Sequence, residues 1–179
     1  MSVDTDEDLA LLRKAANFDE TALSEIYDRY QSALYRYAYR LLGDQQLAED
    51  CIAETFYRFL KNLKKGGMPK ENLRAYLYRI AHNWITDHYR RGQKTRELEL
   101  DDNLVGKEDP VEEANKGLQN ESVRAAILTL TTDQQQASLL KYFEGWQNEE
   151  IAQFMGKRVG AVKALLHRSL ATLRKKCTD

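Results

Sequence analysis

The residues best suited to binding chemistry lie in the C-terminal stretch 147–176. From Lys157 to Thr178 the chain has seven basic residues and no acidic one. The outer face of the helix expected here combines small and positive side chains, namely Arg158, Ala161, Lys163, Ala164 and Arg168. A low, positive surface suits the major groove of duplex DNA, where basic groups contact phosphates and guanine and methyl groups contact thymine. These five residues are therefore candidate contacts to duplex DNA.

Two helices joined by a tight turn are predicted to position these side chains. Ile151 and Phe154 recur at helical spacing in the first helix, and Gly156 supplies a residue that readily adopts a positive φ. The second helix has one apolar stripe, made of Val159, Val162, Leu166, Leu170 and Leu173. This layout is typical of a helix-turn-helix, whose second helix contacts bases. The alternative is a helical hairpin with a merely solvated basic face, which would give no reason for the small residues.

A second stretch suited to nucleic acid is the helix expected over 71–91. Its inward stripe is predicted to be Leu73, Leu77, Ile80 and Trp84. Its outward side, with Asn83 on the flank, interleaves rings and positive charge: Tyr78, Arg79, His82, Thr86, Tyr89 and Arg90. Rings stack on unpaired bases while arginines follow phosphates, so this side suits single-stranded nucleic acid. Packing of the tyrosines against a neighbouring helix is the alternative, and the sequence leaves it open.

Residues suited to catalysis are not apparent. The chain has no phosphate-binding loop, metal-ligand spacing or nucleophile motif. Its histidines are His82, His88 and His167, and the first two are six positions apart, which does not align them as a metal pair on one helix face. We therefore expect no enzyme activity, no catalytic residue, no metal site and no cofactor.

Charge is distributed in blocks along the 179 residues, although the formal net charge is only −1. The stretch 58–96 has eleven Lys or Arg residues and two acids, whereas 97–113 has eight acids and one Lys. Near-neutrality thus results from cancellation between basic and acidic blocks. The acidic N-terminus has no signal-peptide pattern, and no apolar run is long enough to span a membrane. Two cysteines without C-x-x-C spacing fit a reduced compartment, so a cytoplasmic location is expected.

The fold class is predicted to be all-α, because prolines are few and strand-like alternation is absent. Helices are expected over 6–16, 22–42, 46–63 and 71–91, then two more within 116–145 before the helix-turn-helix. The stretch 92–115 has weak periodicity and many acids, which is typical of a flexible linker. The predicted organisation is two small helical domains, 1–91 and 116–179, joined by the acidic linker 92–115.

Three motifs connect these segments to a known family. They are AEDCIAETFYRFL at 48–60, NLRAYLYRIAHNWITDHYRR at 72–91 and LLKYFEGWQNEEIAQFMGKRVGAVKALLHRSLATLR at 139–174. In this order and spacing, the chain resembles the sigma-70 family of RNA polymerase sigma factors, specifically the extracytoplasmic-function (ECF) group, nearly end to end. The resemblance implies a region 2 helical bundle at 1–91 and a region 4 helix-turn-helix domain at 116–179.

That resemblance implies a promoter-specificity subunit that binds core RNA polymerase, recognises minus-thirty-five and minus-ten elements and helps to melt DNA. Asp50, Glu54 and Phe56 would contact the polymerase, with Phe56 acting as either an anchor or a core residue. The minus-ten contacts would be Arg79, His82, Asn83, Asp87 and Arg90, and the loop 61–72 would hold an unpaired base. The five residues of the basic helix would contact the minus-thirty-five duplex. An anti-sigma factor is implied as a partner, and the free protein is expected to be a monomer.

Several positions depart from the family pattern. Leu165 stands where many members have Arg, Ala161 and Ala164 where Thr and Ser are common, and His82 where Arg is frequent. Gln147 replaces a frequent Ser, which leaves Asn148 as the expected N-cap. Two alternatives remain. A free-standing helix-turn-helix regulator would leave 48–91 unexplained, and a family member that acts only through protein contacts is kept open by Leu165.

Overall fold

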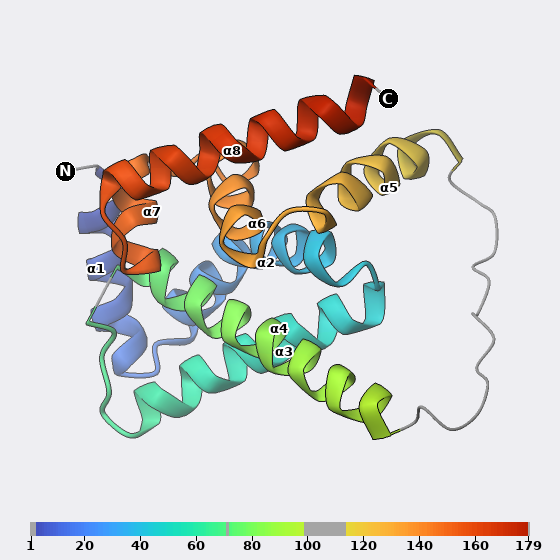
Figure 1. Ribbon diagram of the computed structural model, residues 1–179. Helices are drawn as coiled ribbons and strands as arrows, with labels where there is room; N and C mark the ends of the chain where they lie inside the picture. The colour runs from blue at the N-terminus through green and yellow to red at the C-terminus, as the bar shows by residue number, and fades with distance from the viewer. Residues whose placement is uncertain (1–2, 71, 99–113, 179) are drawn as a thin grey trace. The chain divides into compact units, whose positions relative to one another are not determined.

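The structure is a computed structural model of the chain, which describes residues 3–70, 72–98 and 114–178. In these ranges all regular structure is helical, which confirms the all-α class (Figure 1). The helices are α1 (Val3–Ala16), α2 (Glu20–Leu42), α3 (Gln45–Lys64), α4 (Leu73–Leu98), α5 (Ala114–Leu128), α6 (Thr132–Ser138), a π-helix η1 (Leu139–Phe143), α7 (Asn148–Met155) and α8 (Val159–Thr178). The chain divides into two compact units, 1–95 and 96–179. Helix α4 continues into the stretch expected as a linker, and residues 99–113 of that stretch lie outside the described residues.

The first unit is built from α1, α2, α3 and most of α4 around one apolar core. Ile26 and Leu34 of α2, Phe59 of α3 and Leu77 of α4 are at most 1% exposed. The boundary between α2 and α3 follows from local chemistry. Gly43 adopts a left-handed φ of 67° after α2, and the Asp44 carboxylate accepts a 2.8 Å hydrogen bond from the backbone of the next helix. The predicted stop at this glycine is confirmed.

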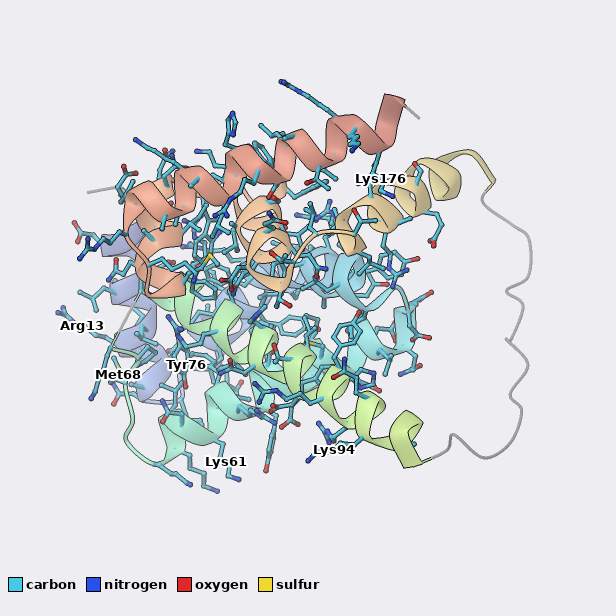
Figure 2. The ribbon with its side chains drawn as sticks, in the orientation of Figure 1. Arg13, Lys61, Met68, Tyr76, Lys94 and Lys176 are labelled. Carbon is cyan, nitrogen blue, oxygen red and sulfur yellow. The ribbon has the colours of Figure 1, made fainter. Side chains whose placement is uncertain are left out.

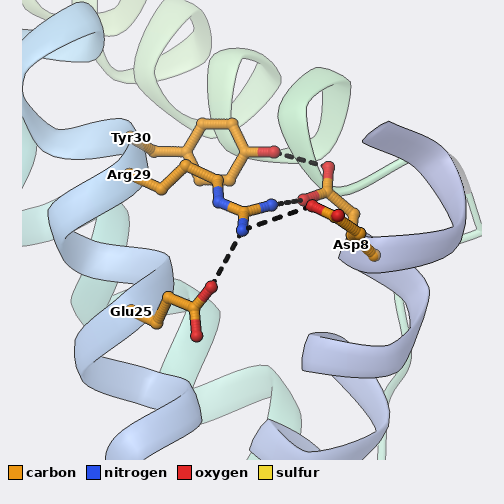
Figure 3. Close-up of polar contacts among 5 residues, drawn as sticks. Asp8, Glu25, Arg29 and Tyr30 are labelled. Atoms are coloured by element: carbon orange, nitrogen blue, oxygen red, sulfur yellow. Dashed lines mark hydrogen bonds and ion pairs between the residues drawn. The ribbon is translucent and has the colours of Figure 1, made fainter. Parts of the chain in front are cut away.

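A buried carboxylate joins α1 to α2 (Figure 3). Asp8 is 7% exposed and accepts hydrogen bonds from the Tyr30 hydroxyl at 2.5 Å and from Arg29 Nη1 at 2.9 Å. The same guanidinium also reaches Glu25 of α2 at 2.9 Å. Because a buried carboxylate is costly unless it is paired, these bonds allow Asp8 to sit between the helices. The cluster therefore holds α1 against α2 within the first unit.

Cys51 lies on the buried side of α3, as its place on the apolar stripe predicts. It is 0% exposed, and burial raises the pKa of its thiol to about 12. The reactive thiolate is therefore suppressed near neutral pH. In a Cys177→Ser background, we expect iodoacetamide to leave Cys51 unmodified in the folded protein at pH 8 and to modify it fully in urea, as measured by mass spectrometry. Complete labelling without denaturant would contradict this burial.

The second unit packs α5 to α8 around a separate core. Trp146 is 2% exposed and meets the ring of Phe154 edge-on at 5.2 Å, while Leu139, Leu140 and Val162 are fully buried. A turn of π-helix, Leu139–Phe143, and Gly145 at φ 69° bring the chain from α6 to this tryptophan. Gly156, at φ 64°, then ends α7. The predicted short helix, glycine turn and longer helix are all present.

Two details of the helix-turn-helix differ from the prediction. The buried stripe of α8 continues through Ser169, which is 0% exposed, whereas Leu170 is 37% exposed. Ser169 can be buried because its hydroxyl donates to the carbonyl of Leu165 at 2.8 Å within the helix. The N-cap of α7 is Gln147 rather than Asn148, since the Glu150 carboxylate accepts a 2.7 Å hydrogen bond from the Gln147 backbone N–H.

Candidate nucleic-acid interface

The outer face of α8 and its preceding turn is open and positively charged. All five residues predicted to contact duplex DNA are exposed: Arg158, Ala161, Lys163, Ala164 and Arg168. The Arg168 guanidinium lies along the helix, where its Nε donates to the carbonyl of Ala164 at 3.3 Å. Leu165, the departure from the family pattern, is half-buried at the border of this face. The face therefore offers small side chains at its centre and basic groups around them, without an apolar ridge.

This face is held in place by contacts within the second unit. Val162 and Leu166 anchor the inner side of α8, being at most 6% exposed. The turn itself is fixed twice at Lys157, whose backbone N–H donates to Ala152 at 2.9 Å and whose ammonium lies 2.9 Å from the carboxylate of Asp133. Since this lysine is occupied by Asp133, its role is to hold the turn. Arg158, the next residue, remains exposed.

The exposed side of α4, in the C-terminal half of this helix, presents a second polar face, which belongs to the first unit. Asn83, Asp87 and Arg90 are exposed there, and the first two lie one helical turn apart. Asp87 and Arg90 are 4.0 Å apart, which is a weak, solvent-exposed ion pair. Arg79 is half-buried further toward the start of the helix. The Asn83 amide can donate hydrogen bonds to base edges and accept them, and the Asp87 carboxylate can accept them.

The predicted outward position of Tyr78 is wrong. Tyr78 is 2% exposed and meets the ring of Tyr37 edge-on at 5.3 Å. His82 is half-buried, with its Nδ1 2.9 Å from the hydroxyl of Tyr37. The helix meets Tyr37 of α2 and Cys51 of α3. Its buried side is wider than one stripe and includes Leu73, Leu77, Tyr78, Ala81 and Ile85.

The remaining aromatic residues of α4 lie at the edge of this buried side. Trp84 is half-buried and stacks on His88, with ring centroids 5.5 Å apart and an angle of 10°. It therefore does not belong to the core, where the sequence pattern places it. Tyr89 is 44% exposed, and its hydroxyl donates to the carbonyl of Leu41 at the end of α2. Both rings leave part of their surface accessible on α4.

The outer face of α3 combines acidic groups with an exposed ring. Asp50 is exposed and accepts a hydrogen bond from Gln46 at 3.1 Å, whereas the Glu54 carboxylate is already 2.6 Å from Arg58 Nε. The sequence prediction does not include Tyr57, which is 57% exposed on this face. Its spacing from Asp50 and Glu54, seven and three residues, is the signal that could have identified it. These side chains form one accessible surface.

Phe56 does not belong to that surface. It is 9% exposed and packs against Tyr27 of α2, with ring centroids 4.8 Å apart. Of the two roles that the resemblance leaves open, anchor or core, the structure thus favours core.

Within the described residues, no group of three or more His, Cys, Asp or Glu could hold a metal ion. Nor do the described helices include one long and apolar enough to cross a bilayer.

Comparison with known proteins assigns both units. Residues 26–95 match the family model of sigma-70 region 2, and residues 120–173 match that of sigma-70 region 4. The chain is 29% identical over 174 residues to the ECF RNA polymerase sigma factor BldN of Streptomyces coelicolor, with 96% of this chain and 66% of BldN covered. It is 29% identical over 168 residues to the ECF sigma factor SigL of Mycobacterium tuberculosis, with 93% and 94% covered.

Two solved structures have a similar fold. CnrH, in complex with the cytosolic domain of CnrY, has a TM-score of 0.73 at 23% identity, and the match covers 94% of this chain and 95% of CnrH. The sigma factor RpoE of Bartonella quintana, in complex with the anti-sigma factor NepR, has a TM-score of 0.67 at 22% identity, with 87% and 96% covered. The helical arrangement of this chain is therefore one that occurs in solved structures.

Proposed function

This chain belongs to the sigma-70 family of RNA polymerase sigma factors, in its ECF group, and we propose that its three exposed faces divide the tasks of a promoter-specificity subunit. The single observation that carries this assignment is that the predicted contact residues of α8 and of the outer half of α4 are exposed on separate units. We assign 1–91 to polymerase and minus-ten binding, 116–179 to minus-thirty-five binding, and 92–115 to the linker. A free-standing regulator would need only α7 and α8 and would leave the match at 26–95 unexplained.

The α8 face would bind the minus-thirty-five element as duplex. Arg158, Lys163 and Arg168 can contact phosphates or guanine, and the methyl groups of Ala161 and Ala164 can meet thymine methyls. Because the small residues lie at the centre of the face, the helix can approach the floor of the groove closely. Few direct polar contacts to bases are then available, so a large part of the affinity comes from phosphates.

The α4 face would recognise the minus-ten element as it opens. Asn83 and Asp87 can form hydrogen bonds to base edges, with Arg90 near the backbone of the DNA. Capture of an unpaired base offsets the unstacking cost of about a few kcal/mol, so that binding itself drives local melting. Arg79 and His82 complete the predicted set from half-buried positions. The hydrogen bond of His82 to Tyr37 supports a role in holding α4 in place behind these contacts.

The α3 face would bind core RNA polymerase. Asp50 and Glu54 provide negative charge for basic partner residues, and Tyr57 adds a large ring of the kind enriched at interfaces. Phe56 would contribute from inside, by fixing α3 against α2 through Tyr27. All chemistry of RNA synthesis would remain with the polymerase, so that this chain has no catalytic residue and needs no cofactor.

The partners and location follow from the same assignment. The similar CnrH and RpoE structures contain the cytosolic domain of CnrY and the anti-sigma factor NepR, respectively. Their occurrence supports an anti-sigma factor as a partner of this chain, one that covers its polymerase-binding surface until a signal releases it. The protein would act in the cytoplasm, where promoter DNA and polymerase are found, and would be a monomer when free.

Run-off transcription from a pool of random promoter fragments tests this proposal. With core polymerase, we expect transcripts that appear only when the protein is added and that share a two-part upstream motif. Core polymerase alone and the protein alone serve as controls. A shift of duplex DNA by the protein without any transcript would instead favour the free-standing regulator, and neither activity would favour a role through protein contacts only.

A further inference from the structure

One asparagine organises the connection between α3 and α4. Asn62, in the last turn of α3, is half-buried, and its carbonyl accepts backbone hydrogen bonds from Lys65 at 3.1 Å and from Gly67 at 2.9 Å. Its side chain forms a further hydrogen bond, in which Nδ2 donates to the carbonyl of Gly67 at 3.3 Å. Backbone and side chain of one residue therefore fix the first half of the connection. Gly66 provides the turn with a φ of 75°.

The Asn62 carboxamide occupies the place of a side chain at position 67. A Cβ on Gly67 would lie 2.2 Å from Oδ1 and 2.8 Å from Cγ of Asn62. The backbone of Gly67 does not have the positive φ that requires glycine, and the three atoms nearest to such a Cβ all belong to the Asn62 carboxamide. We refer to this contact between Asn62 and Gly67 as the asparagine lock.

The lock holds a short basic loop open to solvent. Lys65, Met68 and Lys70 are exposed, with 40% of Met68 accessible, and Figure 2 shows Met68 in the connection that follows Lys61 at the end of α3. At the far end, the Asn72 side chain accepts a 2.8 Å hydrogen bond from the N–H of Ala75 and starts α4. The loop is thus tied at both ends, and it presents positive charge at Lys65 and Lys70 with the apolar side chain of Met68 between them.

We propose that Asn62 is a positioning residue for minus-ten recognition, whose lock on Gly67 holds the loop 65–70 in the shape that receives an unpaired DNA base. This inference rests on the proposed function. Asn62 does not itself contact DNA. A loop that is ordered before binding does not lose its conformational freedom when the base arrives, and so the lock strengthens capture of the base. A purely structural role, ending α3, would leave base capture unchanged whenever the fold is intact.

Two substitutions remove the lock from opposite sides. Asn62→Ala deletes the carboxamide, whereas Gly67→Ala displaces it and leaves Asn62 in the chain. The second substitution is mild for the fold because the clashing atoms belong to the end of a flexible side chain. Since both act on one contact, their effects on base capture are expected to be equal, and the double variant is expected to lose no more than either single one. Asn17→Ala is the matched control, because the Asn17 side chain, at the exposed end of α1, donates to the carbonyl of Arg13 within its own helix.

The measurement is the affinity of the holoenzyme for two probes built on a promoter selected by run-off transcription. One probe is duplex through minus-thirty-five with a single-stranded minus-ten segment, and the other ends before minus-ten. For each lock variant we expect about a tenfold weaker binding to the first probe, and no change in binding to the second probe or to core polymerase. Thermal unfolding verifies that the variants are folded.

Wild-type affinity in both single variants would overturn the inference, as would equal losses on the two probes or additive losses in the double variant. If Asn62→Ala does not fold, Gly67→Ala decides the question alone. Failure of the proposed function is a separate result, because wild-type protein would then give no promoter to select and no preference for the single-stranded probe.

Discussion

Replacing Asp50 with Lys is expected to weaken binding to core RNA polymerase by about a hundredfold, which corresponds to loss of a charge pair in a desolvated interface. Asp50 is exposed on α3 and accepts only a neutral hydrogen bond from Gln46 among the contacts described above, so its carboxylate can pair with a basic partner. Lys at this position would place two positive charges together. Competition with labelled wild-type protein for core polymerase measures the change.

Glu49→Lys is the matched control for this substitution. Glu49 precedes Asp50 on the same helix, is exposed, and bonds to Gln45 in the way that Asp50 bonds to Gln46. The two variants have the same net charge but point their lysines in directions about 100° apart around the helix. An equal loss in both would indicate a general charge effect and would contradict a specific role for Asp50. Unchanged affinity in Asp50→Lys would remove α3 from the polymerase interface.

Asp8→Ala is expected to lower the free energy of unfolding of the first unit by about 3 kcal/mol, since it leaves a buried hydroxyl and a guanidinium without their acceptor. Tyr30 is 7% exposed, so its hydroxyl has little access to water, whereas the partly exposed Arg29 keeps Glu25 as a partner. Hydrogen exchange of peptides from residues 3–70 in the full chain reports the opening free energy of this unit.

Asp6→Ala is the control for Asp8→Ala, because Asp6 is an exposed carboxylate on the same helix, and its removal is expected to change stability by less than about 0.5 kcal/mol.

Burial, and then the hydrogen bond to Asp8, raise the pKa of Tyr30 above its ordinary value. The neutral ring therefore stabilises the fold fully below about pH 10, and this contribution is lost as the pH rises above that value. Tyr30→Phe should remove this alkaline dependence. Equal destabilisation by Asp6→Ala and Asp8→Ala would contradict the role of the buried cluster.

Most of the fold could be predicted from the sequence, because local signals determine where these helices begin and end. Gly43 with Asp44, and Gly156 between α7 and α8, mark boundaries through backbone conformation and capping, which depend on neighbouring residues only. The exposed face of α8 could also be predicted from the sequence, since Ala161 and Ala164 lie opposite the buried stripe. Local spacing is sufficient for α8 because its buried residues, Val162, Leu166 and Ser169, form a single stripe, although the helix contacts both α6 and α7.

The prediction fails on α4, whose buried side is wider than one stripe. Tyr78 looks outward from the stripe of α4, but α2 supplies Tyr37, 41 positions earlier, as a partner for its ring. His82 meets the same tyrosine across 45 positions. Such pairs depend on which helices become neighbours, and this information is not contained in the spacing of one helix. Phe56 is similar, because only the presence of Tyr27 decides between core and surface.

The absence of acidic residues from Lys157 to Thr178 has a consequence for the way in which the two units share their work. Each phosphate that a basic side chain of α8 neutralises releases condensed cations from the duplex. A plot of the logarithm of the affinity against the logarithm of the salt concentration therefore has a slope of about −0.9 for each such contact. Asn83 and Asp87 bring no positive charge, so their contacts release almost no ions. Among the predicted contacts of α4, Arg90 is the exposed basic residue, whereas the face of α8 has three, namely Arg158, Lys163 and Arg168. Under the proposed function, binding of the minus-thirty-five element would therefore weaken more steeply with rising ionic strength than binding of the minus-ten element.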